Sequence, residues 1–195
     1  CGLGDTSSWF GRSTFSPGIY GSTFSCVGGS PIIVYSDDLE SQGGWTGDFG
    51  TGNGSSGFWN MNSGPTGSSG TGPSGAHSGS NYFYFESSGS GLDAASIISP
   101  IIDLTNATGG AELSFYYHFY GSSGGILQVS VSTDNINYTA LDVLSMYQTS
   151  ESDPFVPVGI DLSSYVGQII YLKFTYVRGS QGTSYQGDIA IDLVE

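Results

Sequence analysis

The clearest pattern along the chain is an alternation of apolar and polar residues in its second half. In segment 112–120, Leu, Phe and Tyr side chains share one face while Ser, Tyr and His side chains share the other, and segment 169–177 repeats this arrangement. A period of two is typical of a strand that buries one face. Similar patterns predict strands at 32–35, 81–86, 95–102, 126–132 and 187–194.

These segments leave little room for helix. Only 161–166 has the composition of a short helical turn, and the Gly- and Ser-rich stretch 121–125 predicts a hairpin between the strands on either side of it. We therefore predict an all-β fold, a two-sheet antiparallel β-sandwich of jelly-roll type.

The chain divides into two parts by composition. Residues 1–33 are rich in Gly and Ser without sustained alternation and are interpreted as an N-terminal extension, whereas 34–195 is interpreted as the sandwich domain. Within that domain, 41–80 is dominated by Gly, Ser, Thr, Asn and Pro, and a loop of this length is usually functional. We expect the contact surface on this loop and on 178–187.

The strongly negative charge of the chain excludes some classes of binding partner. Three Lys and Arg residues stand against 17 Asp and Glu residues, so the formal net charge is -14. Three cations cannot neutralise a phosphate backbone, which excludes nucleic acid and argues against anionic membranes. No apolar run approaches the roughly 18 residues of a spanning helix, so membrane insertion is not expected. At 37% hydrophobic and 14% aromatic, the chain is rich enough in apolar side chains to bury a core.

Both cysteines lie near the start of the chain. Cys1 and Cys26 are predicted to form a disulfide that closes a Gly-rich loop, which suits an oxidising compartment. In the alternative, Cys1 is the lipid-modified first residue of a bacterial surface lipoprotein. Since the chain does not begin with Met, we expect a mature or excised piece of a larger secreted protein.

Catalytic motifs are not convincing in this sequence. The match to G-x-S-x-G at 121–125 lies in a predicted turn and not in the strand-turn-helix elbow that activates a serine. Two histidines without H-E-x-x-H or cysteine ligands do not make a usual zinc site. No pair of carboxylates is singled out for glycoside hydrolysis. We predict that the protein is not an enzyme.

Four carboxylates form the candidate metal site. Asp38 and Glu40 stand two residues apart and Asp188 and Asp192 four apart, so in strands each pair points to one face. Carboxylate oxygens are the hard ligands that Ca2+ prefers, and Na+ is the alternative cation. The competing interpretation is that these side chains are solvated charges at a sheet edge.

Aromatic residues near predicted loops are the second candidate for binding. Trp9, Tyr147 and Tyr185 are placed to stack on sugar rings or to anchor a protein partner.

Three groups of residues carry a resemblance to a known family. They are Asp38-Leu39-Glu40 followed by Gly44-Trp45-Thr46; Gly72-Pro73 through His77, Tyr82 and Glu86 to Ser99-Pro100 and 113–121; and Gly187-Asp188-Ile189-Ala190-Ile191-Asp192. In this order they resemble the MAM domain, an extracellular adhesion and recognition module, over about 34–195. The resemblance implies a jelly roll, a cation site near the opening and closing motifs, and a packed Trp45.

The sequence departs from the MAM pattern at several positions. It lacks the cysteines that animal members carry beside the opening motif, Ala76 stands where an acidic residue often precedes the histidine, and Leu193 replaces the second Asp of the closing motif. The chain is therefore similar to a bacterial or otherwise divergent member, and it lacks two of the acidic residues from which the family's cation site would be carried over.

The resemblance implies an extracellular, non-catalytic, calcium-stabilised recognition or adhesion module, one part of a larger secreted or cell-surface protein, with a protein or glycan partner. One alternative is a carbohydrate-binding module of a secreted polysaccharide-degrading enzyme. A second is a repeating unit of a surface fibre or adhesin, in which 1–33 mediates self-association by strand addition.

Overall fold

The computed structural model describes residues 32–52, 54–89, 91–179 and 185–195. Cys1, Trp9 and Cys26 lie outside these ranges, as does nearly all of the expected N-terminal extension. The predictions for those residues therefore stay predictions.

The described residues form eleven strands and one short 3-10 helix. In chain order these are β1 (Thr46–Gly47), β2 (Trp59–Asn62), β3 (Tyr82–Phe85), β4 (Ala94–Ile98), β5 (Ile102–Asp103), β6 (Glu112–Phe119), β7 (Gly125–Ser132), β8 (Thr139–Ser145), β9 (Val156–Asp161), the helix η1 (Ser163–Tyr165), β10 (Ile169–Arg178) and β11 (Ile189–Asp192).

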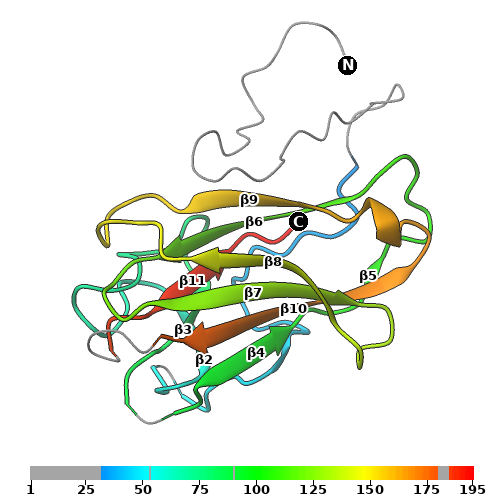
Figure 1. Cartoon of the computed structure of the whole chain (residues 1–195). Helices are drawn as coiled ribbons and strands as arrows, with labels where there is room; N and C mark the ends of the chain where they lie inside the picture. Colours follow the sequence, from blue (N-terminus) through cyan, green and yellow to red (C-terminus); the bar gives the residue numbers. More distant parts are fainter. Residues whose placement is uncertain (1–31, 53, 90, 180–184) are drawn as a thin grey trace, which may run out of the picture.

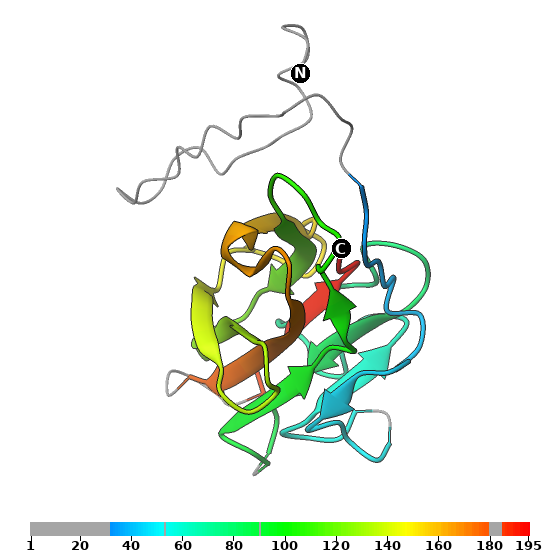
Figure 2. The same ribbon diagram turned by 90° about the vertical axis from the view of Figure 1, so that its right-hand side faces the viewer.

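The strands pack as two antiparallel sheets, which confirms the predicted all-β sandwich (Figures 1 and 2). One sheet has the order β1-β4-β10-β7-β8, with β5 also pairing β10. The other has the order β2-β3-β11-β6-β9. Neighbours in these orders are mostly distant in sequence, as a jelly roll requires.

Aromatic rings from both sheets fill the space between the layers. Phe174 in the middle of β10 lies 5.8 Å from Trp45 and 5.1 Å from Phe115 of the opposite sheet, measured between ring centroids. Trp45 also meets Phe83 edge-on at 5.8 Å. Burial contributes roughly 2 kcal/mol for each such side chain. Trp45 is only 1% exposed, so its expected packing is confirmed.

The turn at 121–125 does not close a hairpin, which corrects the prediction from sequence. β6 lies in the five-stranded sheet, whereas β7 pairs with β8 and β10 in the other sheet. Both sheets of a sandwich bury one face, so alternation identifies a strand without saying which sheet it joins. The turn carries the chain from one layer to the other.

Two other predicted segments differ from the structure. Segment 32–35 forms no strand, and the sheet contact there is a single bridge between Asp37 and Val194. Segment 95–102 is divided into β4 and β5, with Pro100 between them, because proline has no N–H for the ladder. The short helical turn predicted at 161–166 is confirmed as η1.

The outer face of the five-stranded sheet is covered by the long loop between β2 and β3, residues 63–81, here called the covering loop. Tyr82 and Tyr84 of β3 and Ala190 of β11 form a second apolar cluster on this face, packed against Ala76 of the loop. The Thr71 hydroxyl donates to the carbonyl of Tyr120 at 3.0 Å. The loop therefore turns an outer face into a second buried layer.

Candidate functional site

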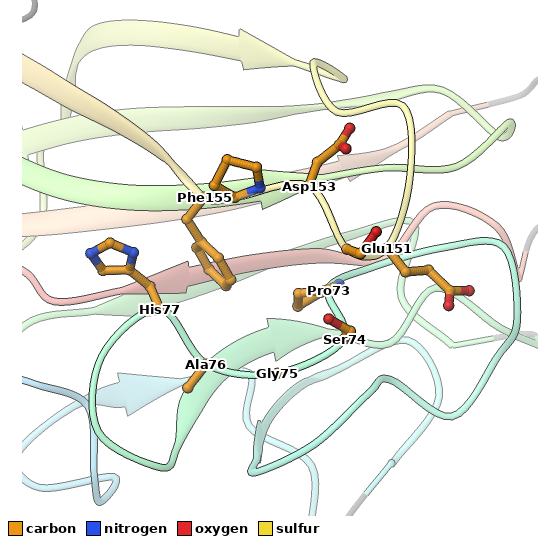
Figure 3. Close-up of a pocket in the computed structure, with 10 residues that line it drawn as sticks. Pro73, Ser74, Gly75, Ala76, His77, Glu151, Asp153 and Phe155 are labelled. Carbon is orange, nitrogen blue, oxygen red and sulfur yellow. The ribbon is translucent and has the colours of Figure 1, made fainter.

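A pocket of about 290 Å³ opens where the covering loop meets the loop between β8 and β9 (Figure 3). Its lining comes from two short segments, 73–77 and 151–155. In Figure 3, His77 and Glu151 lie at opposite ends of the pocket with Phe155 between them. We call this the loop pocket.

One wall of the loop pocket is aromatic. The His77 imidazole stacks on the ring of Tyr116 with centroids 3.7 Å apart and planes 18° apart, and it lies 5.9 Å from Phe155. His77 is exposed to solvent, although Tyr116 is half-buried and Phe155 is buried beneath it. The stack thus presents a flat, accessible ring at the mouth of the pocket.

The other wall is polar and is held rigidly by hydrogen bonds. The Ser74 amide donates to the carbonyl of Glu151 at 2.8 Å, and the Glu151 carboxylate accepts from the amide of Gly70. The Asp153 carboxylate accepts from the amides of Thr149 and Ser150, and these bonds hold its pKa at about 2. Glu151 therefore joins the two loops, whereas Asp153 stabilises the conformation of the β8–β9 loop to which it belongs.

Gln148 ties the β8–β9 loop to β6 from below. Its Oε1 accepts from the amide of Phe119 at 2.8 Å, and its Nε2 donates to the carbonyls of Tyr117 and Pro154 at 3.1 and 3.3 Å. Sequence reasoning missed this buried amide. A single Gln in a loop carries no pattern that distinguishes it from an exposed one.

Two of the predicted metal ligands anchor the last turn of the covering loop. Glu40 Oε1 accepts from the amides of Ser80 and Asn81 at 2.6 and 2.9 Å. Asp192 Oδ2 accepts from the amides of His77 and Ser78 at 2.8 and 2.9 Å. Backbone N–H groups therefore point at these carboxylates, so both act as hydrogen-bonded anchors of the covering loop.

The other two predicted ligands lie apart from this anchor. Asp38 is exposed and accepts from the amide of Glu40 at 3.4 Å. Asp188 is fully buried at the opposite end of β11 from Asp192. Within the described residues, no three His, Cys, Asp or Glu side chains are grouped closely enough to hold a metal ion. Calcium binding by the four predicted carboxylates stays a prediction.

The predicted aromatic contacts are exposed but lie outside the lining of the loop pocket. Tyr147 is 59% exposed and Tyr185 is 42% exposed. Trp9 lies outside the described residues. His77, whose ring lines the pocket, was not predicted as a binding residue; it was named from the sequence only as part of the MAM-like motif.

The fold defines a two-sheet antiparallel β-sandwich module with a loop-lined pocket at one face. The family model of the MAM domain, meprin/A5/mu, matches residues 38–195, and the chain belongs to the MAM domain family. Among the described residues, no helix is long and apolar enough to cross a membrane.

Solved structures with a similar arrangement are distant in sequence. The family 22 carbohydrate-binding and catalytic modules of xylanase 10B from Clostridium thermocellum match at 14% identity and a TM-score of 0.43, over 83% of this chain and 27% of that one. The C-terminal family 22 carbohydrate-binding module of the same enzyme matches at 13% identity and a TM-score of 0.44. The match covers 84% of this chain and 94% of that one. A xylan-binding domain of Paenibacillus barcinonensis Xyn10C matches at 12% identity and a TM-score of 0.43. The match covers 84% of this chain and 98% of that one. The chain thus spans about a quarter of the first of these proteins.

Proposed function

We propose that this MAM domain is an extracellular recognition module that binds a neutral glycan in the loop pocket. The observation that carries the proposal is the exposed imidazole of His77, stacked on Tyr116 beside a polar rim. A sugar ring offers an apolar face for stacking and hydroxyls around its edge. The two walls of the pocket match these two surfaces.

Size and charge restrict the ligand further. At about 290 Å³ the pocket lies at the small end of ligand sites, which suits one or two sugar units at the tip of a chain. The formal net charge of -14 repels acidic ligands, so a neutral glycan is favoured over a sulfated or uronic one.

Binding without catalysis is supported by the state of the two pocket carboxylates. Glycoside hydrolysis needs one carboxyl group that holds a proton and a second that is free to act on the sugar or on water. Asp153 is committed to the amides and hydroxyls of Thr149 and Ser150, which favour its ionised form. Glu151 accepts from Gly70. These contacts favour a structural role for Asp153 and Glu151, in holding the shape of the pocket, over a catalytic one.

A glycan array followed by calorimetric titration of the best ligand tests this proposal. His77→Ala removes the stacked ring but keeps the backbone amide that donates to Asp192, so the loop anchor is retained. We expect binding at least about tenfold weaker, equivalent to 1.4 kcal/mol. The matched control is Val143→Ala, which shortens an exposed side chain on β8 of the other sheet.

The control variant should bind like the wild type. Absence of any glycan ligand on the array, or equal affinity of wild type and His77→Ala, would show that the pocket does not bind sugars in this way.

A further inference from the structure

Two buried carboxylates lie side by side at one end of β3 and β11. Ile189 pairs with Phe85 across these strands, and continuing the register by one residue places Asp188 opposite Glu86. Asp188 is 0% exposed and Glu86 is 4% exposed. Side chains directly opposite each other in an antiparallel pair have Cβ atoms about 5 Å apart. The two negative groups are therefore close neighbours in a water-poor environment.

The hydrogen bonds around Asp188 satisfy only one of its oxygens. Oδ1 accepts from the amide and the hydroxyl of Ser87 at 2.9 and 3.0 Å. Among the described residues, Oδ2 is buried and has no hydrogen-bond partner. A buried carboxylate oxygen without a partner is costly, so this atom marks a missing ligand or a missing proton.

The neighbours of this pair offer oxygen atoms as well as hydrogen-bond donors. The Thr66 hydroxyl lies close enough to the Asp188 carboxylate to favour its charged form, and it donates to the carbonyl of Thr71 at 3.1 Å. Glu86 Oε1 accepts from the amide of Ser88 at 3.0 Å, while Oε2 faces Gly67 of the covering loop. Three oxygen-bearing side chains thus converge in one place.

No described basic group neutralises the pair. Arg178, at the end of β10, donates its Nη1 to the carbonyl of Gly89 at 2.7 Å instead. Two adjacent buried carboxylates without a positive partner are unfavourable unless a cation binds them or one of them takes up a proton.

We propose that a divalent cation with a preference for oxygen ligands, with Ca2+ as the probe, binds between Glu86 and Asp188 beneath the covering loop. Asp188 Oδ2 and Glu86 Oε2 supply its charge-neutralising ligands, and the Thr66 hydroxyl supplies a third oxygen. Ca2+ takes about six to eight oxygens, so water and loop carbonyls complete the shell. A second cavity of about 270 Å³ is lined in part by Gly67 of the covering loop and by Tyr84 of β3.

This site is separate from the cluster predicted by sequence. Of the four predicted ligands, only Asp188 belongs to it, and Glu86 takes the place of the other three. Asp192 ends β11 and Glu40 contacts the residues just before β3, and both hold the loop by accepting from backbone amides. They therefore supply control carboxylates at the opposite end of this strand pair.

Terbium luminescence tests the site directly, because Tb3+ replaces Ca2+ and is sensitised by nearby tyrosines. Tyr84 is close enough for the charges of Glu86 and Asp188, after burial itself, to raise the pKa of its hydroxyl. We expect the full chain to show sensitised emission that Ca2+ displaces. Glu86→Gln and Asp188→Asn should each weaken binding at least about tenfold. Glu40→Gln and Asp192→Asn should leave it unchanged.

The proposal does not depend on the folding of one variant. If Asp188→Asn fails to fold, Glu86→Gln and Ca2+ competition on the wild type still decide the question. Three results would overturn the site: no displaceable emission from the wild type, unchanged emission in Glu86→Gln, or loss of emission in the Glu40 and Asp192 variants. None of these readouts depends on glycan binding.

Discussion

At the scale of single residues, His118 has the most unusual environment on the covered face. Its ring is completely buried on β6, 5.5 Å from the ring of Phe155, and among the described residues neither ring nitrogen has a hydrogen-bond partner. Burial lowers the pKa of His118 to about 4, and the nearby backbone of Ser150, followed by the charges of Asp153 and Glu151, opposes the shift only in part. The imidazole is therefore neutral in the folded protein at pH 7.

The lowered pKa of His118 predicts a loss of stability in acid. Between about pH 6.5 and pH 4 the unfolded chain takes up a proton that the folded chain does not, so the free energy of unfolding falls as the pH falls. The full effect is about 3 kcal/mol below pH 4. Urea unfolding at several pH values should show it, and His118→Leu should reduce the slope in this window.

An identical pH dependence in His118→Leu and the wild type would show that this histidine is not held neutral.

At the scale of elements, Asp37 connects the first described segment to the core. Its Oδ2 accepts from the Trp45 indole at 3.0 Å and from the Tyr35 hydroxyl at 3.2 Å, and its Oδ1 accepts from the amide of Leu39 at 2.9 Å. Its backbone also bridges to Val194 near the end of the chain. One carboxylate thus orients the segment that leads into β1.

Removing this carboxylate should loosen the segment. We predict that Asp37→Ala lowers the free energy of unfolding by about 2 kcal/mol, because the buried indole N–H loses its acceptor along with two other bonds. Its neighbour gives the control: Asp38 is exposed and accepts one long bond from Glu40, so Asp38→Ala should cost less than about 0.5 kcal/mol. Chemical denaturation compares them, and equal losses would contradict the assignment.

The elements that sequence predicts well are those with one buried face. β6 and β10 alternate because one side of each faces the core, and both were predicted within two residues of their ends. β8 lies at a sheet edge and is mostly exposed or half-buried on both faces, so it has no clear pattern and was missed. β9 was also missed, because it contains Pro157 and Gly159, two residue types that are uncommon inside strands and that here occur in an edge strand.

The two sites proposed here depend on contacts that a linear pattern does not contain. Glu86 and Asp188 meet only because β3 pairs with β11, about a hundred residues later in the chain. The stack of His77 on Tyr116 depends on the path of a loop without periodicity. The sequence supplied the carboxylates and the family, whereas their grouping needed the pairing of the strands.

At the scale of the whole molecule, repulsion among the negative charges lowers the stability of the folded state, and the salt concentration changes the strength of this repulsion. A formal net charge of -14 repels itself in the compact state, and the Debye length falls from about 30 Å at 0.01 M salt to about 8 Å at 0.15 M. Screening by any salt should therefore stabilise the fold, whereas binding of an ion at the Glu86 and Asp188 site should act at far lower concentration. The two effects are separable.

Thermal unfolding in NaCl and in CaCl2 at matched ionic strength separates them. NaCl should raise the Tm gradually, and equally in wild type and Glu86→Gln, because screening depends on total charge. CaCl2 at about 100 times its dissociation constant should add about 2.7 kcal/mol to the wild type, a rise of about 5–10 °C in Tm. Glu86→Gln should lose most of that increment while keeping the response to NaCl. If both salts act alike on both proteins, the stabilisation is screening alone, because a bound ion must distinguish the protein that has its ligand from the one that lacks it.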